Sequence, residues 1–133
     1  MKTSELTGAA LDWAVGTANG GLYQSASARD AFWIWPGEPV KYSKAPPAYS
    51  TDWAQGGPII ERERIDTSTN YQDDPTGTDM VAVGWKASYW NNSMPGTPGF
   101  CKWAYGPTPL IAAMRVFVSS KLGDEVEVPE ELT

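Results

Sequence analysis

The chain has 133 residues, of which 41% are hydrophobic and 20% charged, and its formal net charge is −6. This composition is typical of one globular domain spanning residues 1–133, and it excludes a disordered or membrane-spanning chain, because no apolar run approaches the ~20 residues that cross a bilayer. The negative charge argues against direct binding to nucleic acid, which depends on clustered lysine and arginine. We expect a cytoplasmic protein that contacts neither nucleic acid nor membrane.

The chain contains no histidine and a single cysteine, Cys101. The absence of histidine excludes Ser-His and Cys-His nucleophile pairs, histidine acid–base chemistry and the usual zinc sites. One cysteine cannot form an internal disulfide, which fits a reducing compartment. The remaining carboxylates, lysines and tyrosines form no catalytic motif. We therefore expect a protein that is not an enzyme and that uses neither a cofactor nor a metal.

The first predicted element is a helix within residues 4–16. Thr3 or Ser4 is its candidate N-cap, and Glu5 lies in the first turn, where a negative charge interacts favourably with the helix dipole. Apolar residues at helical spacing support the prediction: Leu11, Ala14, Val15 and Ala18.

Short strands are predicted where the chain is rich in Val, Ile and aromatic residues, at residues 31–35, 58–63 and 80–89. Residues 66–79 and 91–99 are predicted as long polar loops. Near the C-terminus, residues 125–128 alternate Glu and Val, which is typical of a half-exposed strand.

The segment 49–57 combines an aromatic ring, hydrogen-bonding side chains and two glycines before a proline. Ser, Thr and Asp compete with the backbone for its hydrogen bonds, which favours a turn over a helix. Paired glycines let a ligand approach the backbone closely. The segment is either a structural turn or a binding loop that forms one concave site. Its candidate ligand-binding residues are Tyr49, Ser50, Thr51, Asp52, Trp53, Gln55, Gly56 and Gly57.

The second predicted helix begins at Thr108, an N-cap, with Pro109 at the first helical position and Gly123 at the end. Its apolar stripe is formed by Leu110, Ile111, Met114, Phe117, Val118 and Leu122. Arg115 lies at the margin of this stripe and is the ninth candidate ligand-binding residue. Two roles are open for Arg115: an ion pair with Asp52 or a carboxylate of residues 61–63, or a contact with a ligand phosphate.

Helices near both ends of a chain of short strands predict a small α+β domain. We expect the N- and C-terminal helices to pack on a sheet of short, mainly antiparallel strands.

Three blocks of sequence occur in a fixed order: SELTGAALDWAV at 4–15, YSTDWAQGGPIIERE at 49–63, and GPTPLIAAMR at 106–115 followed by GDEV at 123–126. In this order they resemble the NinX family of lambdoid phages and prophages, a family of unknown function. The segments near 24–48 and 66–103 diverge from the family pattern. The resemblance implies a phage accessory protein acting in the host bacterial cytoplasm, and it carries over no catalytic residues.

Two functions are compatible with these observations. The first is non-enzymatic binding of a small, nucleotide-type molecule to counter host defence, by analogy with phage proteins that act through stoichiometric capture. The alternative is an acidic modulator of a host enzyme or DNA-binding protein, since Trp and Tyr are enriched in interface hot spots. A small ligand, a host protein and a second copy of the chain are thus the partners to consider.

Overall fold

The computed structural model describes residues 1–24, 31–41, 45–91 and 100–132. In chain order these form η1 (Thr3–Glu5), α1 (Gly8–Ala18), β1 (Leu22–Gln24), β2 (Phe32–Ile34), α2 (Trp53–Glu63), β3 (Asp66–Asp73), β4 (Met80–Asn91), β5 (Phe100–Gly106), α3 (Pro109–Leu122) and η2 (Glu130–Leu132). Strands β1 and β2 form a small antiparallel sheet, and β3, β4 and β5 form a second one in that order. The predicted α+β class is confirmed.

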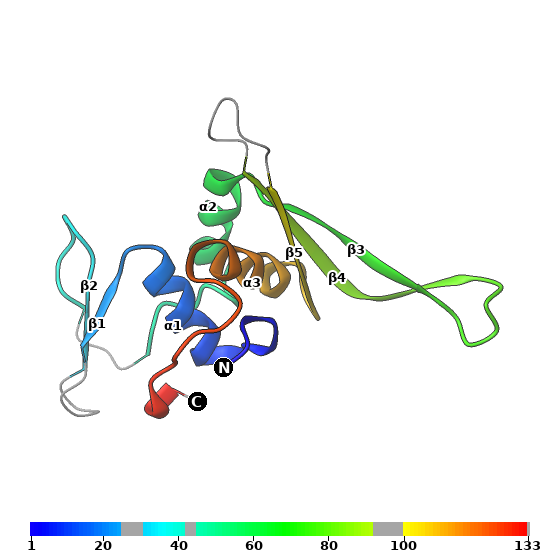
Figure 1. The fold of residues 1–133 in the computed structure, drawn as a ribbon. Helices are drawn as coiled ribbons and strands as arrows, with labels where there is room; N and C mark the ends of the chain where they lie inside the picture. The colour runs from blue at the N-terminus through cyan, green and yellow to red at the C-terminus, as the bar shows by residue number, and fades with distance from the viewer. Residues whose placement is uncertain (25–30, 42–44, 92–99, 133) are drawn as a thin grey trace.

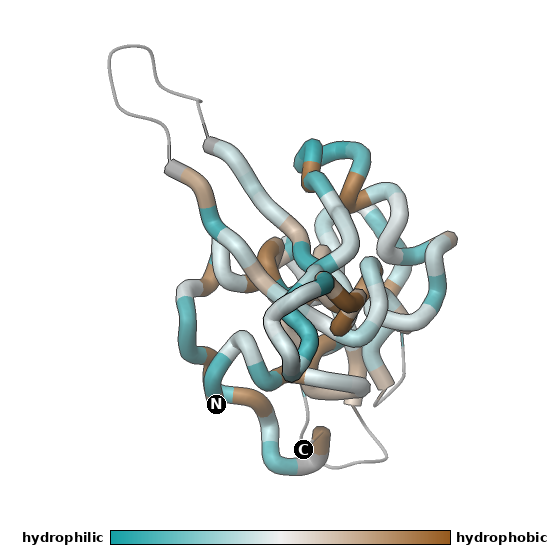
Figure 2. The backbone as a smooth tube through the Cα atoms, turned by 90° about the vertical axis from the view of Figure 1, so that its right-hand side faces the viewer, coloured by the Kyte–Doolittle hydropathy of each residue, from teal (hydrophilic) through white to brown (hydrophobic). Residues whose placement is uncertain are grey.

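Helix α3 occupies the centre of the fold, between the three-stranded sheet and helices α1 and α2 (Figure 1). Its limits agree with the prediction: the Thr108 hydroxyl accepts the Ile111 N–H, and Gly123 ends the helix with a φ of 91°. Because it is enclosed on several sides, α3 is buried well beyond the predicted stripe, including Ala112, Ala113 and Val116. Figure 2 shows the hydrophobic residues gathered toward the middle of the molecule.

The N-terminal segment forms two helical elements instead of the single predicted helix. The turn η1 ends at Glu5, and α1 begins only at Gly8, so neither Thr3 nor Ser4 caps it. Thr3 is buried, and its hydroxyl donates to the Gly123 carbonyl at 2.8 Å while its N–H donates to the Asp124 carbonyl at 2.9 Å. Thr3 therefore ties the N-terminal segment to the end of α3 instead of capping the first helix, whose N-cap is Thr7.

Residues 53–63 form helix α2, so the predicted strand at 58–63 is wrong. The turn predicted for segment 49–57 is limited to residues 49–51, and its second half is helical. The Asp52 carboxylate caps α2 by accepting the Ala54 N–H at 2.9 Å. Gly56 is the point of closest packing, because a Cβ there would collide with the Tyr49 carbonyl oxygen and lie 2.7 Å from Leu110 Cδ1. Capping and close packing thus outweigh the low helix propensity of two glycines and a proline.

The three-stranded sheet was largely missed. Residues 66–73 form β3 instead of a polar loop, because both of its faces are partly solvated and polar side chains are tolerated there. Strand β5 was not predicted, and the predicted strand at 125–128 is reduced to a single bridge between Glu125 and Lys2. Most of the loop predicted at 91–99 lies outside the described residues.

Beyond a bulge near residue 70, β3 and β4 continue as a twisted hairpin that projects away from the helices (Figure 1). We call residues 70–83 the arm. Four large apolar side chains of the arm are exposed: Tyr71, Met80, Val81 and Val83.

Candidate functional site

The structure distributes the residues of segment 49–57 over several roles. Tyr49 and Ser50 are buried, and the Ser50 N–H donates to the Asp12 carboxylate at 2.8 Å. Thr51 and Gln55 are exposed, and Gly57 is half-buried in α2. Trp53 is 54% exposed, so it is not sealed in the core. Its ring lies 3.8 Å from the position that a Cβ on Gly57 would occupy, one helical turn further on.

Of the eight candidate residues in this segment, only Tyr49 and Gln55 line a common hollow, which Ala54 also lines. It has a volume of about 250 Å³, and we call it the α2 hollow. Trp35, Lys41 and Arg62 also line it. Asp52 and Trp53 do not line it, although the sequence led us to expect these side chains to converge with Tyr49 and Gln55. The volume is below the ~300–1,000 Å³ that is usual for small-molecule pockets.

A larger hollow, of about 600 Å³, lies between strand β5, the turn η1 and helix α3, and we call it the β5 hollow. Three aromatic residues line it: Trp85, Trp103 and Tyr105. Thr3, Ser4, Ser119 and Asp124 add polar groups to its lining. This volume is within the range of pockets that enclose a small molecule.

Arg115 is the one predicted site residue that lines the β5 hollow. Its Nε donates to the Leu6 carbonyl at 2.9 Å, and its Nη1 donates to the Tyr105 carbonyl at 2.7 Å. These bonds hold the end of η1 against β5 and use two of the five guanidinium N–H groups, which leaves three for a further acceptor. Burial lowers the pKa of Arg115, but a guanidinium remains charged at neutral pH.

The predicted ion pair of Arg115 with Asp52 or with residues 61–63 is wrong. The ion pairs found among the described residues join Arg62 and Lys121 to Glu63, and Lys102 to Asp124. Arg115 meets main-chain carbonyls because the start of the domain folds back across α3, an arrangement that helical periodicity cannot reveal.

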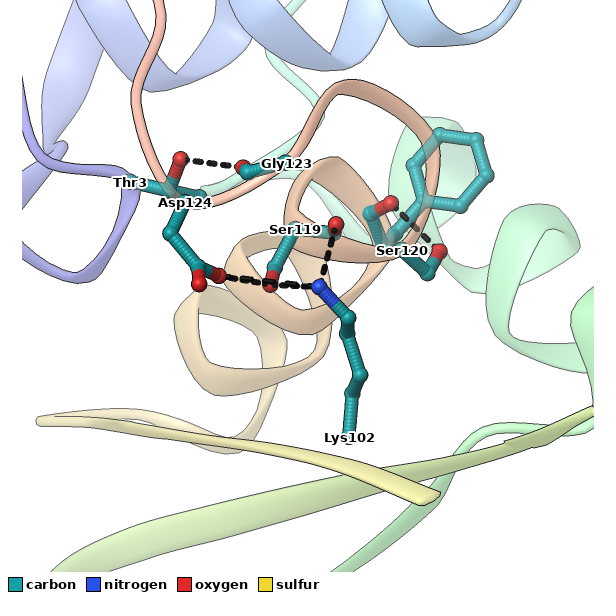
Figure 3. Close-up of polar contacts among 7 residues, drawn as sticks. Thr3, Lys102, Ser119, Ser120, Gly123 and Asp124 are labelled. Carbon is teal, nitrogen blue, oxygen red and sulfur yellow. Dashed lines mark hydrogen bonds and ion pairs between the residues drawn. The ribbon is translucent and has the colours of Figure 1, made fainter. Parts of the chain in front are cut away.

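Figure 3 shows a polar cluster that includes Ser119 and Asp124, two residues that line the β5 hollow. Lys102 extends from β5 toward α3, where its Nζ donates to the Ser119 carbonyl at 3.1 Å and lies 3.6 Å from Asp124 Oδ1. The Ser119 hydroxyl donates to the same carboxylate oxygen at 2.9 Å. Lys102 neutralises the charge of Asp124. The charge of Arg115 therefore gives the walls of the hollow a net positive charge.

Trp85, Trp103 and Tyr105 are not among the site residues predicted from the sequence. The alternation Lys102-Trp103-Ala104-Tyr105 is the signal that could have revealed them, since it places two rings on one face of a strand and a small buried residue on the other.

In the described ranges, no group of three or more Asp, Glu or Cys side chains is placed to hold a metal ion. None of the helices described here is long and apolar enough to cross a bilayer.

The sequence profile of the family Bacteriophage P22, NinX matches residues 2–121. The chain belongs to the NinX family. The match includes Arg115 and the aromatic residues of the β5 hollow, and it runs through the segments 24–48 and 66–103. No curated protein matches this NinX chain.

Proposed function

We propose that this NinX protein is a non-enzymatic phage accessory protein that captures a small anionic molecule with a flat ring, such as a nucleotide. The β5 hollow is the proposed site. The observation that carries the proposal is one hollow of about 600 Å³ that is lined by Arg115 of α3 and Trp85 of β4 and, across the edge strand β5, by Trp103 and Tyr105.

The chemistry of the β5 hollow matches the two parts of such a ligand. Aromatic side chains bind planar rings by stacking, and this interaction tolerates different bases. A guanidinium binds phosphate through two parallel hydrogen bonds, and its position here is fixed by the Leu6 and Tyr105 carbonyls. The exposed Ser4 adds a hydroxyl that can donate to a phosphate or ribose oxygen.

Stoichiometric capture requires affinity and no reaction, so it fits a chain without a catalytic motif. In an infected bacterium, capture of a nucleotide signal would lower the concentration available to host defence. We place this role in the host cytoplasm, where such signals are made.

Isothermal titration calorimetry with a panel of mono-, di- and cyclic nucleotides tests the proposal. Wild type should bind at least one of them, and Arg115→Lys should weaken binding about 10- to 100-fold, since a hydrogen bond to a charged group contributes about 1.5–3 kcal/mol. Arg64→Lys is the matched control, because Arg64 is exposed at the end of α2 and lines neither hollow.

Arg115 also has a structural role, so a second variant is needed. Tyr105→Ala removes a ring that is 55% exposed and keeps the carbonyl that Arg115 contacts. It should weaken binding with little change in melting temperature. No binding to wild type, or an equal loss in Arg64→Lys, would refute the proposal.

The arm supports a second candidate function, the modulation of a basic host protein. It carries three aspartates, Asp73, Asp74 and Asp79, and no lysine or arginine, next to the exposed Tyr71 and Met80. An acidic and apolar projection complements a basic surface such as that of a DNA-binding protein. Affinity purification from infected cells, with wild type and with Tyr71→Ser/Met80→Ser, should show a host protein that only the wild type retains. Equal recovery with both would exclude the arm as the contact.

A further inference from the structure

The three-stranded sheet has an open face, turned away from α3, that carries three exposed aromatic side chains. In β4 and β5, Lys86 is paired with Tyr105, Ser88 with Trp103 and Trp90 with Cys101. Paired residues share a face, and the alternating residues Ala87, Tyr89 and Ala104 belong to the core. Trp90, Trp103 and Tyr105 are accordingly 57%, 53% and 55% exposed.

The charges on this open face are balanced. Strand β3 adds Asp66, paired with Ser88, and Ser68, paired with Lys86. Lys86 is the cation, and its Nζ lies 5.5 Å from the centre of the Trp103 ring. This face has one charge of each sign, whereas the whole chain has a net charge of −6. A basic partner therefore gains no electrostatic advantage from binding this face and not another surface of the protein. The two signs instead allow the face to complement a copy of itself.

We infer that the open face binds the open face of a second copy of the chain, in a dimer with two-fold symmetry. Strands lie ~4.8 Å apart and rise ~3.3 Å per residue, which fixes the relative positions of the side chains on the face. A two-fold axis between the two faces, running past Trp103 and midway between Lys86 and Asp66, brings three contacts together.

The first of these contacts is Trp103 against Trp103 of the other copy. The second places Trp90 of one copy beside Tyr105 of the other. The third places Lys86 opposite Asp66 in both directions. One axis therefore satisfies the rings and the charges together, as an isologous interface requires.

The area of the face favours a reversible dimer. Three rings at about half exposure offer roughly 300 Å² of apolar surface, if a whole aromatic residue buries ~150–250 Å². A standard interface buries ~800 Å² per partner, so the remainder comes from the polar side chains of the face and from the base of the arm. The dimer should form as the concentration rises.

Sedimentation velocity from about 1 µM to about 200 µM, the range in which weak complexes dissociate, tests the inference. Wild type should move from the mass of one 14.5 kDa chain toward twice that mass. Trp90→Ser should raise the dissociation constant about tenfold or more. Trp53→Ser is the matched control, because Trp53 is 54% exposed on α2 and should leave the constant unchanged. A monomer throughout the range, or equal effects of the two variants, would overturn the inference.

A charge exchange tests the proposed axis and the identity of the partner together. Lys86→Glu and Asp66→Lys should each weaken the dimer, because each change brings like charges together twice across a two-fold axis. The double variant restores opposite charges and should return the dissociation constant to near the wild-type value. Failure of the double variant to recover, with both single variants folded by circular dichroism, would contradict the Lys86–Asp66 contact. Trp90, Lys86 and Asp66 do not line the β5 hollow, but Trp103 and Tyr105 belong both to that hollow and to the open face. The dissociation constants are therefore measured on protein freed of small-molecule ligand.

Discussion

At the scale of single residues, Asp12 is the one acidic side chain that is buried among the residues that the structure describes. It is only 8% exposed, on α1, and it accepts the Ser50 N–H at 2.8 Å, which ties the first helix to the chain before α2. Burial raises the pKa of Asp12, and the hydrogen bond from the Ser50 N–H opposes that shift without cancelling it. The folded protein therefore favours the protonated form more than the unfolded chain does.

Because of this difference in pKa, the free energy of unfolding should depend on pH. When the pKa of a carboxyl is raised in the folded state, the carboxyl stabilises the fold fully at pH values below its ordinary pKa of 3.8. This stabilisation is lost as the pH rises through the pKa of the folded state. Asp12→Asn keeps an oxygen that can accept the Ser50 N–H and does not titrate. Urea unfolding from about pH 4 to pH 7 should show the variant gaining stability relative to wild type as the pH rises. A relative gain by the wild type would show that Asp12 is stabilised as an anion.

For Arg115, the sequence predicted the position of the side chain correctly but not the groups to which it is hydrogen-bonded. The helical spacing placed it at the margin of the core, where its side chain is half-buried. Its acceptors, the Leu6 and Tyr105 carbonyls, belong to segments whose approach depends on the whole fold. The β5 hollow has the same origin, since it joins η1, β5 and α3.

At the scale of elements, a comparison of α3 with α2 shows when local sequence signals are sufficient to predict a helix. Thr108, Pro109 and Gly123 specify the ends of α3 locally, and the structure confirms them. Helix α2 contains residues that disfavour a helix, and it forms because Gly56 allows it to pack against the Tyr49 backbone and Leu110. Helix propensity alone therefore predicts the wrong secondary structure where tertiary contacts determine it.

The neighbouring glycines of α2 provide a matched test of this explanation. Gly56→Ala should destabilise the protein by about 1–3 kcal/mol, as overpacking typically does, because its Cβ would meet backbone at Tyr49. Gly57→Ala meets only the Trp53 ring, at 3.8 Å, and should stabilise the protein by about 0.5–1 kcal/mol through helix propensity. Both changes are measured by chemical denaturation. Equal effects of the two substitutions would contradict a packing role specific to Gly56.

At the scale of the whole molecule, a compact body and a projecting arm are distinct. The core cluster is built from α1, α2, α3 and the parts of β4 and β5 that face α3. The arm contributes no member to that cluster, and its polar first strand, residues 70–73, resembles a loop in sequence. That half of the arm was therefore missed, whereas residues 80–83 belong to the strand predicted at 80–89, which β4 confirms. The fold class was also predicted correctly.

Shortening the arm tests this division. Replacement of residues 71–82 by a short turn should change the free energy of unfolding by less than about 1 kcal/mol, because surface segments away from the core contribute little. Thermal and chemical denaturation give the comparison with the full-length chain. A large loss of stability would show that the arm supports the body of the protein.

Native mass spectrometry of the protein purified from phage-infected bacteria tests the central claim, capture of a small molecule in the β5 hollow, most directly. The wild type should carry an additional mass of a few hundred daltons per chain, and Arg115→Lys should have lost it while Arg64→Lys retains it. Wild-type protein with no bound small mass, or with only a bound polypeptide, would contradict the account.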